Sequence, residues 1–287
     1  MSEFRKIPIV VLGYKDYVTA DEFLGRFEES LRDVLELVFV DNCSKDGSFE
    51  KLQSKYGHLG AFIKTSENKG YASGNNFGLR YIKENISTDK VIISNPDIVF
   101  TSDMVKELSK RMDAYEDVKI ASTSIVGMDG NKQVAAWKLP SLAREALSSL
   151  VITNKIFKLD KKLYTKEELE RPEIFVEAVN GSFFMADMKA LEEVDFFDED
   201  TFLYCEENIL GYKLKDRGYK ELLVNDLSYI HKHNATIGKV FRKRKNRYLI
   251  LQDSRRVYLK KYKKCGKLKM MFFNIASAIG HLERIWT

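Results

Sequence analysis

The residues with the clearest chemical potential lie in four polar motifs that stand far apart in the chain. The motifs are VDNCSKDGS (40–48), NKGYASGNNFG (68–78), SNPDIVF (94–100) and FFDEDTFLYCEENILGYKLKDRGYK (196–220). Carboxylates, side-chain amides and glycines dominate them. Each motif has a ligand-binding interpretation and a purely structural one.

The third motif places Asn95 and Asp97 on either side of Pro96, directly after an apolar segment. Proline fixes the backbone and disfavours a helix at the residue before it. The Asp97 carboxylate would then project beyond the end of a strand. A hard oxygen ligand in that place suits Mg²⁺ or Mn²⁺ holding a diphosphate. The structural alternative is a turn that the aspartate closes with its own side chain.

The second motif has glycines at 70, 74 and 78, where a helix is expected to begin. Each glycine weakens a helix by about 1 kcal/mol relative to alanine. A spacing of four residues places the glycines near one helical face. That face would admit a flat ligand or backbone, or it would pack tightly on a sheet. The spacing matches neither a Walker A loop nor the dinucleotide-binding fingerprint.

Two further motifs supply carboxylates. Asp41 ends an apolar strand and could accept a hydrogen bond from a base N–H, or it could belong to an ordinary strand–turn–helix link. Glu206 and Glu207 are neighbours at the expected start of a helix, so only one of them is expected to face a pocket. The helix dipole favours the charged carboxylate, whereas aromatic burial and the second carboxylate raise its pKa. A general base needs that balance, although acidic residues also decorate helix N-termini structurally.

His231 and His233 stand at the end of an expected strand. A histidine there could complete a metal shell or bind phosphate. The structural alternative is a surface histidine, and we favour it for His233.

Alternating strands and helices must position these motifs. Apolar, β-branched runs predict strands at Ile7–Leu12, Leu35–Asp41, Ala61–Thr65, Lys90–Ser94 and Val118–Thr123. Helical periodicity predicts helices at Ala20–Leu31, Phe49–Tyr56, from the glycine motif to Asn85, at Ser102–Tyr115 and at Glu206–Arg217. Later strand material is expected at Val176–Ala186, broken at Asn180-Gly181, and at Glu221–Val224 and Tyr229–His231. The alternation predicts a mostly parallel α/β sheet with helices on both faces, which binds ligands at the carboxyl ends of its strands.

Composition and charge limit the classes of protein that remain. With 287 residues, 44% of them hydrophobic, the chain is long enough for one large domain or for one domain with an appendage. Residues 239–269 hold 14 Lys/Arg and a single acid, and the remainder has a net charge of −8. A basic, helical tail of this kind seeks membranes, nucleic acid or phosphorylated substrates. The three cysteines are scattered, and the sequence shows neither a signal-peptide pattern nor an apolar run of about 18 residues. These features predict a cytoplasmic protein without a membrane span.

Taken in order from Ile7 to about His231, the four motifs and the later IHKH resemble family 2 glycosyltransferases. They are most similar to the bacterial rhamnosyltransferase-like branch, which builds cell-surface polysaccharides. The resemblance implies a GT-A-type, Rossmann-like domain over residues 1–236, with a nucleotide-binding half at about 1–123 and an acceptor half at about 124–236. Residues 237–287 would form the basic, amphipathic helical extension.

The resemblance also implies roles for individual residues. Asp41 would meet the pyrimidine base, and Asp97 would ligate Mg²⁺ or Mn²⁺ on the diphosphate. Glu207 falls on the position of the family's usual base, with Glu206 beside it, and His231 falls on the late histidine, a further metal ligand. The donor-binding residues implied are Asp41, Asn42, Asn68, Gly70, Gly74, Asn75 and Asn95.

The implied reaction is an inverting transfer of a sugar, with rhamnose as a candidate, from a dTDP- or UDP-sugar to a glycan hydroxyl. The acceptor would be lipid-linked, and the enzyme would lie at the inner face of the cytoplasmic membrane. The basic tail and Met270–Ile279, which is too short to span, would contact that surface. Nucleic acid is the disfavoured partner of the tail.

Two rival functions remain open. A sugar nucleotidyltransferase should carry a Gly-rich, Arg-containing loop after its first strand, and GYKDYVTADEF is not such a loop. A non-catalytic nucleotide-sugar or membrane-binding module would tolerate the loss of Asp97 and Glu207.

The chain departs from the family pattern in three places. Glu207 replaces the expected Asp, Lys213 stands where Arg is usual, and Gly13-Tyr14-Lys15 replaces an Asn-Tyr-Asn-like stretch. Sugar specificity is expected in residues 124–200. There, Trp137 could stack on an acceptor sugar or serve as a core or lid residue.

Overall fold

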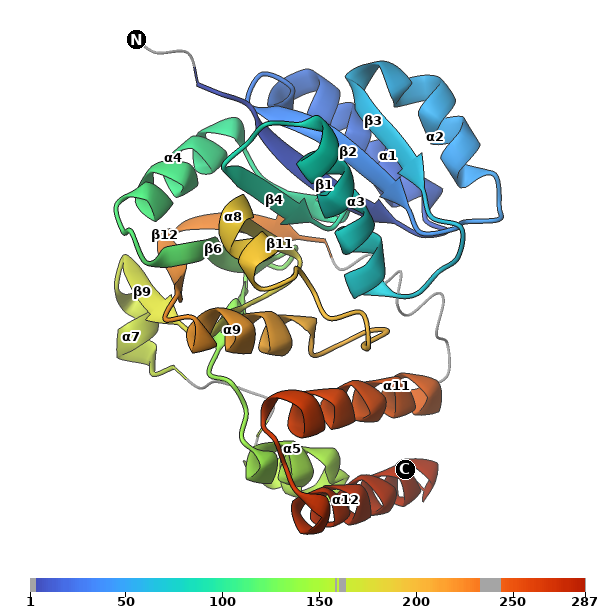
Figure 1. Ribbon diagram of the computed structural model, residues 1–287, viewed down its shortest axis with the longest axis vertical. Coiled ribbons are helices and arrows are strands. Elements are labelled where there is room, and N and C mark those ends of the chain that lie inside the picture. Colours follow the sequence, from blue (N-terminus) through green and yellow to red (C-terminus); the bar gives the residue numbers. More distant parts are fainter. Residues whose placement is uncertain (1–3, 158, 160–163, 233–243, 287) are drawn as a thin grey trace.

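The computed structural model describes residues 4–157, 159, 164–232 and 244–286. Figure 1 shows a twisted sheet surrounded by helices, with a further group of helices stacked at one end of the molecule. Among the described residues, ten strands form the main sheet, in the order β3-β2-β1-β4-β11-β6-β12-β5, with β7 on β6 and β9 on β12. This arrangement confirms the predicted α/β architecture.

The main strands are β1 (Ile7–Gly13), β2 (Leu35–Asp41), β3 (Gly60–Lys64), β4 (Lys90–Ser94), β5 (Ile98–Val99), β6 (Val118–Gly127), β7 (Lys132–Gln133), β9 (Glu173–Val176), β11 (Phe183–Asp187) and β12 (Lys220–His231). A separate antiparallel pair joins β8 (Ala136–Trp137) to β10 (Ala178–Val179).

The helices are α1 (Tyr17–Arg26), α2 (Ser48–Tyr56), α3 (Tyr71–Asn85), α4 (Ser102–Asp113), α5 (Leu142–Ser149), α6 (Val151–Phe157), α7 (Lys166–Glu170), α8 (Met188–Glu193), α9 (Glu206–Asp216), α11 (Arg244–Val257) and α12 (Lys267–Trp286). Helix α1 continues into a π-helical turn at Phe27–Leu31, and α11 continues into another at Tyr258–Tyr262.

The N-terminal half follows the prediction closely. Strands β3, β2, β1 and β4 are parallel, and Val10 of β1 lies between Val38 of β2 and Ile93 of β4. All three side chains are fully buried, which is typical of parallel strands covered on both faces. The carboxyl ends of β1, β2 and β4 therefore meet at one edge, where the polar motifs follow.

The C-terminal half follows the prediction less closely, and two segments differ from it. The strand material expected at Val176–Ala186 is interrupted at the expected Asn180-Gly181 break, but it is divided among three strands, β9, β10 and β11, and β11 lies antiparallel between β4 and β6. A tight turn explains the division, because Asn180 Oδ1 accepts hydrogen bonds from the N–H (2.9 Å) and Oγ (2.7 Å) of Ser182. The two short strands expected at 221–224 and 229–231 form one long strand, β12, with an irregularity between Val224 and Ser228.

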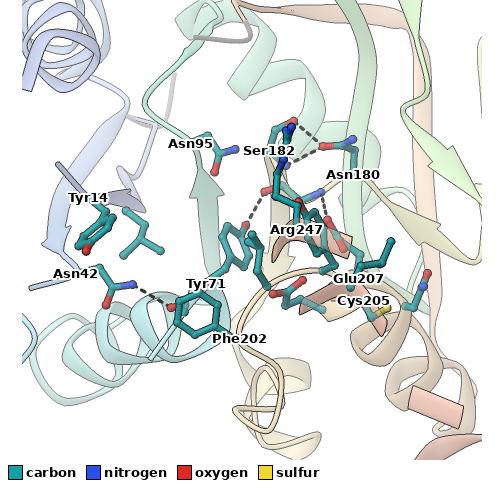
Figure 2. A pocket seen from close by; sticks show the side chains of 18 of the residues that line it. Tyr14, Asn42, Tyr71, Asn95, Asn180, Ser182, Phe202, Cys205, Glu207 and Arg247 are labelled. Atoms are coloured by element: carbon teal, nitrogen blue, oxygen red, sulfur yellow. Dashed lines mark hydrogen bonds between the residues drawn. The ribbon is translucent and has the colours of Figure 1, made fainter. Parts of the chain in front are cut away.

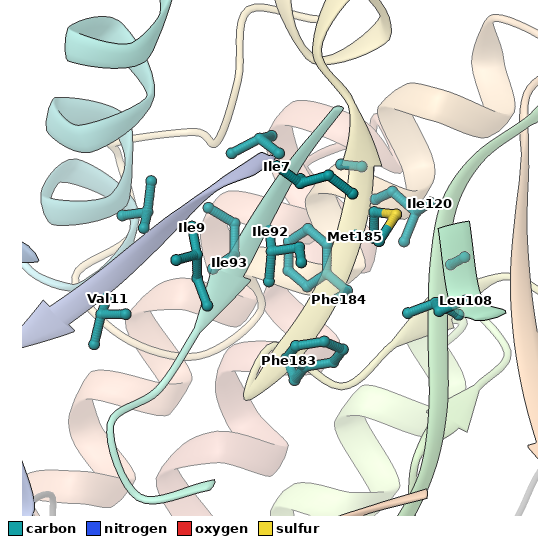
Figure 3. Close-up of a cluster of buried hydrophobic side chains, with 14 of the residues drawn as sticks. Ile7, Ile9, Val11, Ile92, Ile93, Leu108, Ile120, Phe183, Phe184 and Met185 are labelled. Carbon is teal, nitrogen blue, oxygen red and sulfur yellow. The ribbon is translucent and has the colours of Figure 1, made fainter. Parts of the chain in front are cut away.

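The main core lies where β11 joins the two parts of the sheet. Figure 3 shows Phe183, Phe184 and Met185 of β11 beside Ile92 and Ile93 of β4. These five side chains are buried. The Phe183 ring also packs 4.9 Å from that of Phe100 and 5.4 Å from that of Tyr229, measured between centroids. Burying such side chains contributes about 1.5–3 kcal/mol each, so β11 stabilises the junction despite its reversed direction.

A second core holds the helices at the end of the molecule, which we call the helical cluster (α5, α6, α11 and α12). Its buried members are Ala146, Cys205, Ile209, Tyr258, Leu259, Phe273 and Ala276. The expected domain boundary at residues 236/237 and His233 lie outside the described residues. Within the described residues 244–286, the basic segment forms the helices α11 and α12 as predicted, and α5 and α6 from the middle of the chain join them. Within the described ranges, none of the helices combines the length and hydrophobicity required to cross a bilayer.

Candidate functional site

A cavity of about 720 Å³ opens beside the carboxyl ends of β1, β2 and β4. Figure 2 shows side chains from the sheet, from α3 and from α9 around it, with Arg247 of α11 also present. The predicted site residues that line the cavity are Asn42, Asn68, Gly70, Asn95, Asp97, Glu206, Glu207 and His231. Asp41, Gly74 and Asn75 lie outside its lining.

Asn42 lines one end of the cavity, and Asp41 directly before it lies outside the lining. Asp41 is buried, and its carboxylate accepts a 2.7 Å hydrogen bond from the Ser44 N–H. Burial raises the pKa of Asp41, and the hydrogen bonds from Ser44 oppose that rise. Asn42 Nδ2 donates to Gly70 O (3.0 Å) and to Asn68 Oδ1 (3.1 Å), while Thr65 Oγ1 donates to Asn42 Oδ1 (3.2 Å). Asn42 therefore ties the end of β2 to the loop before α3.

The glycines of the second motif have two structural tasks. A Cβ on Gly74 would lie 2.6 Å from Leu12, and one on Gly78 would lie 2.7 Å from Val10, so both glycines let α3 pack directly on the sheet. Gly70 has a φ of +97°, and a Cβ there would lie 1.8 Å from the Phe202 carbonyl oxygen. Gly70 therefore lets the segment before α9 cross the start of α3, where Tyr71 N donates to the same oxygen at 3.0 Å.

Asn75 is buried in α3, where its Nδ2 donates to Tyr71 O at 3.0 Å. Asn95 lines the cavity, and its N–H donates to Ser182 O at 2.8 Å. The turn between β10 and β11 therefore lies beside the end of β4, which brings the third motif close to the break in the C-terminal half.

Asp97 and His231 face one another across the pairing of β5 with β12. His231 Nε2 lies 3.3 Å from Asp97 Oδ2, and the two side chains are 12% and 14% exposed. The Asp97 carboxylate is a hard oxygen ligand of the kind that suits Mg²⁺ or Mn²⁺, and the His231 nitrogen lies beside it. In the part of the chain that the structure describes, no group of three or more His, Cys, Asp or Glu could hold a metal alone. The other ligands would have to come from a bound phosphate and water.

Glu206 and Glu207 begin α9 after two residues with left-handed backbone, Tyr204 (φ 75°) and Cys205 (φ 66°). Glu206 is buried, and its Oε1 has no hydrogen-bond partner among the described residues. Burial and the neighbouring Glu207 charge raise the pKa of Glu206 well above its usual range. Burial also raises the pKa of Glu207, whose Oε1 accepts a 3.1 Å hydrogen bond from the Gly181 N–H.

Several lining residues were not predicted. Tyr71 OH donates to Gly181 O at 2.6 Å, so Tyr71 supports the turn that contacts Glu207 (Figure 2). Trp137, considered above as a stacking, core or lid residue, lines the cavity and donates from Nε1 to Asn208 Oδ1 at 2.6 Å. For the turn at Gly181, the sequence offered one signal, the Asn180-Gly181 break in a strand-like run. The contacts of Tyr71 and Trp137 join residues far apart in sequence, so no local pattern indicates them.

The remaining acids of the fourth motif hold the loop before α9 in place. Asp198 pairs with Lys261 at 2.7 Å, and Glu199 pairs with Arg80 at 2.9 Å. Lys213 donates to the carbonyl oxygens of Phe196 (2.6 Å) and Asp195 (3.2 Å), which both have left-handed backbone. These contacts fix the approach of the chain to Glu206.

The sequence of this chain is similar to that of known glycosyltransferases. Residues 17–193 match the family model described as glycosyl transferase family 2. The N-acetylglucosaminyl-diphospho-decaprenol L-rhamnosyltransferase of Mycobacterium tuberculosis (strain H37Rv) is 23% identical over 240 residues, which cover 81% of this chain and 78% of that protein. The low-salt glycan biosynthesis hexosyltransferase Agl10 of Haloferax volcanii is 23% identical over 209 residues, which cover 73% of this chain and 61% of Agl10.

Solved structures share the fold. The mannosyltransferase PcManGT from Pyrobaculum calidifontis, in complex with GDP-Man and Mn²⁺, aligns with a TM-score of 0.58 and 18% identity, over 98% of this chain and 71% of that one. TarS 1–349 of S. aureus, in complex with UDP-GlcNAc, aligns with a TM-score of 0.55 and 12% identity, over 94% and 70%. These likenesses confirm the GT-A-type fold.

Proposed function

Because the chain belongs to glycosyl transferase family 2, it is a glycosyltransferase, and we propose that it transfers a sugar with inversion from a nucleoside-diphosphate sugar to an acceptor hydroxyl. The observation that carries this proposal is the content of one cavity. It is lined by the Asp97–His231 pair, by Glu207 and by the amides that follow the parallel strands. A phosphate-bearing donor and a hydroxyl acceptor need such groups together.

The donor would occupy the end of the cavity beside β2 and α3. Asn42, Asn68 and Gly70 line that end and are fixed by hydrogen bonds to one another, so they present a preformed surface. Asp41 and Asn75 would support this surface from behind, and Gly74 would let α3 lie close to it. A dTDP- or UDP-sugar is the proposed donor, and TarS, which has the same fold, was solved with UDP-GlcNAc.

Asp97 and His231 would hold a divalent cation, Mg²⁺ or Mn²⁺, against the donor diphosphate, with Asn95 beside them. The PcManGT complex with GDP-Man and Mn²⁺ supports this assignment. When bound, the cation offsets the negative charge that develops on the departing diphosphate. The task of this chain is to hold the ligands in place, and the pairing of β5 with β12 does so.

Glu207 is the proposed general base. The Gly181 N–H holds its Oε1, which orients the carboxylate, and burial raises its pKa above that of an exposed glutamate. A carboxylate with a raised pKa is a better proton acceptor near neutral pH. It would take the proton of the acceptor hydroxyl as that oxygen attacks the anomeric carbon. Glu206 would stay protonated beside it, because paired carboxyls in one pocket separate their pKa values.

We propose that the acceptor is a lipid-linked glycan. The rhamnosyltransferase relative acts on a diphospho-decaprenol according to its name, which supports this class of acceptor and keeps rhamnose as a candidate sugar. The exposed surface of the helical cluster supports the same idea. Two of its helices carry most of its exposed apolar side chains, which are Ile152, Ile156 and Phe157 on α6 and Leu268, Met271, Phe272, Ile275, Ile279 and Leu282 on α12.

This apolar surface would lie on an anionic membrane, as expected for the inner face of the cytoplasmic membrane. Leu268 and Phe157 are 77% and 68% exposed, and the exposed Lys264, Lys267 and Lys269 stand beside the start of α12. An amphipathic helix with apolar residues on one face and lysines nearby binds anionic bilayers at their surface. Ile275→Glu should abolish co-sedimentation with phosphatidylglycerol vesicles, whereas Val18→Glu, at a still more exposed position on α1, should not. Equal binding by both variants would refute the assignment.

Donor binding tests the central proposal. We expect the melting temperature to rise with one class of nucleotide sugar (UDP-, dTDP- or GDP-linked) when Mn²⁺ or Mg²⁺ is present, and not with EDTA. Asp97→Asn should remove this shift, while Asp103→Asn, which changes an exposed aspartate on α4, should preserve it. A folded protein that shifts with no nucleotide sugar would refute the donor assignment.

A further inference from the structure

One face of α11 forms a wall of the cavity. Arg247, Leu251 and Arg255 are spaced by four residues, which places them on the same side of the helix, and all three line the cavity. The sequence pattern had suggested only a basic tail. In the structure, Arg247 of this tail faces the same space as Glu207 (Figure 2), and Asp97 lines that space as well.

The two arginines on this face differ in their partners. Arg255 is neutralised, because its Nε lies 2.6 Å from Glu145 Oε2 and its two Nη atoms donate to Ser149 and Ser148. Arg247 is half-buried at the cavity, and no carboxylate in the described part of the chain forms an ion pair with it. A cation that is partly removed from water without a partner is unfavourable. Arg255 therefore has a structural role, whereas Arg247 leaves an anion-binding position open.

The surroundings of Arg247 connect it to the reaction. Its charge lies near Tyr204, where it opposes the burial that raises the pKa of the phenol. Tyr204 and Cys205 also line the cavity, directly before Glu206, whose buried Oε1 lacks a hydrogen-bond partner among the described residues. The part of the cavity beside α11 thus contains the Arg247 cation and the Glu206 carboxyl group, next to the proposed base Glu207.

We propose that Arg247 binds a phosphate group of the acceptor and so places the acceptor's sugar hydroxyl at Glu207. This inference rests on the proposed function, and it names the acceptor as a phosphorylated lipid. A guanidinium group can hold two phosphate oxygens with parallel hydrogen bonds. The donor diphosphate is assigned to Asp97 and His231 on β5 and β12, so the two phosphate positions lie on different elements.

The helical cluster offers a route for such an acceptor. Helix α11 is fixed to α12, because Tyr248 OH donates to Ser277 O (2.8 Å) and Arg256 Nε donates to Asn274 Oδ1 (3.0 Å). Helix α12 carries the apolar surface proposed above to lie on a membrane. One face of this helix pair would therefore contact the bilayer, while another presents Arg247 to a phosphate that the bilayer delivers. Leu251, one turn further along α11, adds an apolar contact on the same wall.

A direct binding experiment tests the proposal without requiring turnover. Farnesyl diphosphate and farnesol serve as matched probes with and without the diphosphate, and calorimetry with EDTA present prevents binding through a divalent cation. We expect the wild type to bind farnesyl diphosphate more tightly than farnesol. Arg247→Ala should weaken farnesyl diphosphate binding about ten-fold or more and leave farnesol binding unchanged. Lys260→Ala removes the same charge from the exposed turn that continues α11, outside the cavity lining, and should bind both probes as the wild type does.

Each outcome decides the proposal. Wild-type protein that does not discriminate between the probes, or Arg247→Ala protein that binds farnesyl diphosphate normally, would overturn it. Metal-dependent donor binding, measured on the same variants, separates this inference from the proposed function. Arg247→Ala should retain the donor-induced thermal shift, and loss of that shift would assign Arg247 to the donor instead. If the wild type shows no donor shift but binds farnesyl diphosphate through Arg247, the donor assignment fails and the anion site stands.

Discussion

The two sides of the cavity are built on opposite principles. On the amide side (Asn42, Asn68 and Gly70), the polar groups bond to one another, and the glycine lets two backbones meet. On the carboxyl side (residues 204–207), two residues have left-handed backbone, one buried carboxyl oxygen lacks a hydrogen-bond partner among the described residues, and both glutamates have raised pKa values. Strain and shifted pKa values concentrate where groups react. The amide side is therefore a rigid frame, whereas the carboxyl side holds residues in unfavourable backbone conformations and carboxyl groups with raised pKa values, which its chemistry can use.

This contrast leads to different expectations for substitutions. A change on the amide side should lower stability and donor binding together, because its groups hold one another. A change on the carboxyl side should lower turnover while leaving stability intact or even improving it. Three variants, ordered by expected effect, can sharpen or break the comparison.

The largest effect is expected for Glu207→Gln. The amide keeps the shape of the side chain and can still accept the hydrogen bond from Gly181 N–H, but it cannot accept a proton. Loss of a general base lowers the rate by about 10²–10⁴-fold. Sugar transfer should fall by this factor, while the donor-induced thermal shift is retained. Glu167→Gln, in the solvent-exposed helix α7, should transfer sugar at the normal rate. Normal turnover in Glu207→Gln would remove the carboxyl side from the reaction.

Next in size is the effect of Gly70→Ala on stability. The new Cβ would lie 1.8 Å from the Phe202 carbonyl oxygen, and the residue would keep a φ of +97°. We expect the free energy of unfolding to fall by about 3 kcal/mol or more, since strain and a backbone clash add together, and donor binding should weaken as well.

Gly47→Ala is the matched control for Gly70→Ala. Gly47 also has a positive φ (+77°), but a Cβ there would contact nothing within 4 Å. Only the backbone preference is lost, which corresponds to about 1–2 kcal/mol. Urea denaturation of both variants measures the difference. Equal losses would show that the close approach at Gly70 is relieved easily and that the amide side is not rigid.

The amide side was also the more predictable one. Short β-branched runs revealed β1 to β4, and their parallel arrangement places the residues that follow them at one edge, so Asn42 and Asn95 were expected near each other. The sequence could not show which side chains of each motif point toward the cavity. Asp41 turns to Ser44, and Gly74 packs on Leu12, although both stand beside residues that line the cavity.

The carboxyl side and its neighbours depend on contacts between distant segments. The reversed strand β11 was not predicted, because its pairing with β4 joins residues about ninety positions apart and no local pattern records it. Tyr71, Asn180 and Arg247 were missed for the same reason. The sequence did indicate that one member of the Glu206–Glu207 pair could have a raised pKa, and the structure raises the pKa of both because α9 begins inside the molecule.

The smallest expected effect is on the pH dependence of stability, and Glu206→Gln reveals it. The pKa of Glu206 is raised in the native protein, mainly by burial, so the native state retains a proton that the unfolded chain releases above about pH 4.3. The unfolded state then binds fewer protons, and the free energy of unfolding falls as pH rises through this window. One such group contributes a slope of up to about 1.4 kcal/mol per pH unit.

Glutamine cannot titrate, so Glu206→Gln should flatten this slope. The free energy of unfolding of the variant, relative to that of the wild type, should therefore be higher at pH 8 than at pH 4. The slope should not vanish, because the pKa values of Glu207 and Glu221 are also raised by burial. Urea denaturation between pH 4 and pH 8.5 measures the effect, and Glu167→Gln should preserve the wild-type slope. An unchanged or steeper slope in Glu206→Gln would mean that Glu206 is ionised in the native protein. The carboxyl side would then differ from the amide side only in the raised pKa of Glu207 and in the left-handed backbone of Tyr204 and Cys205.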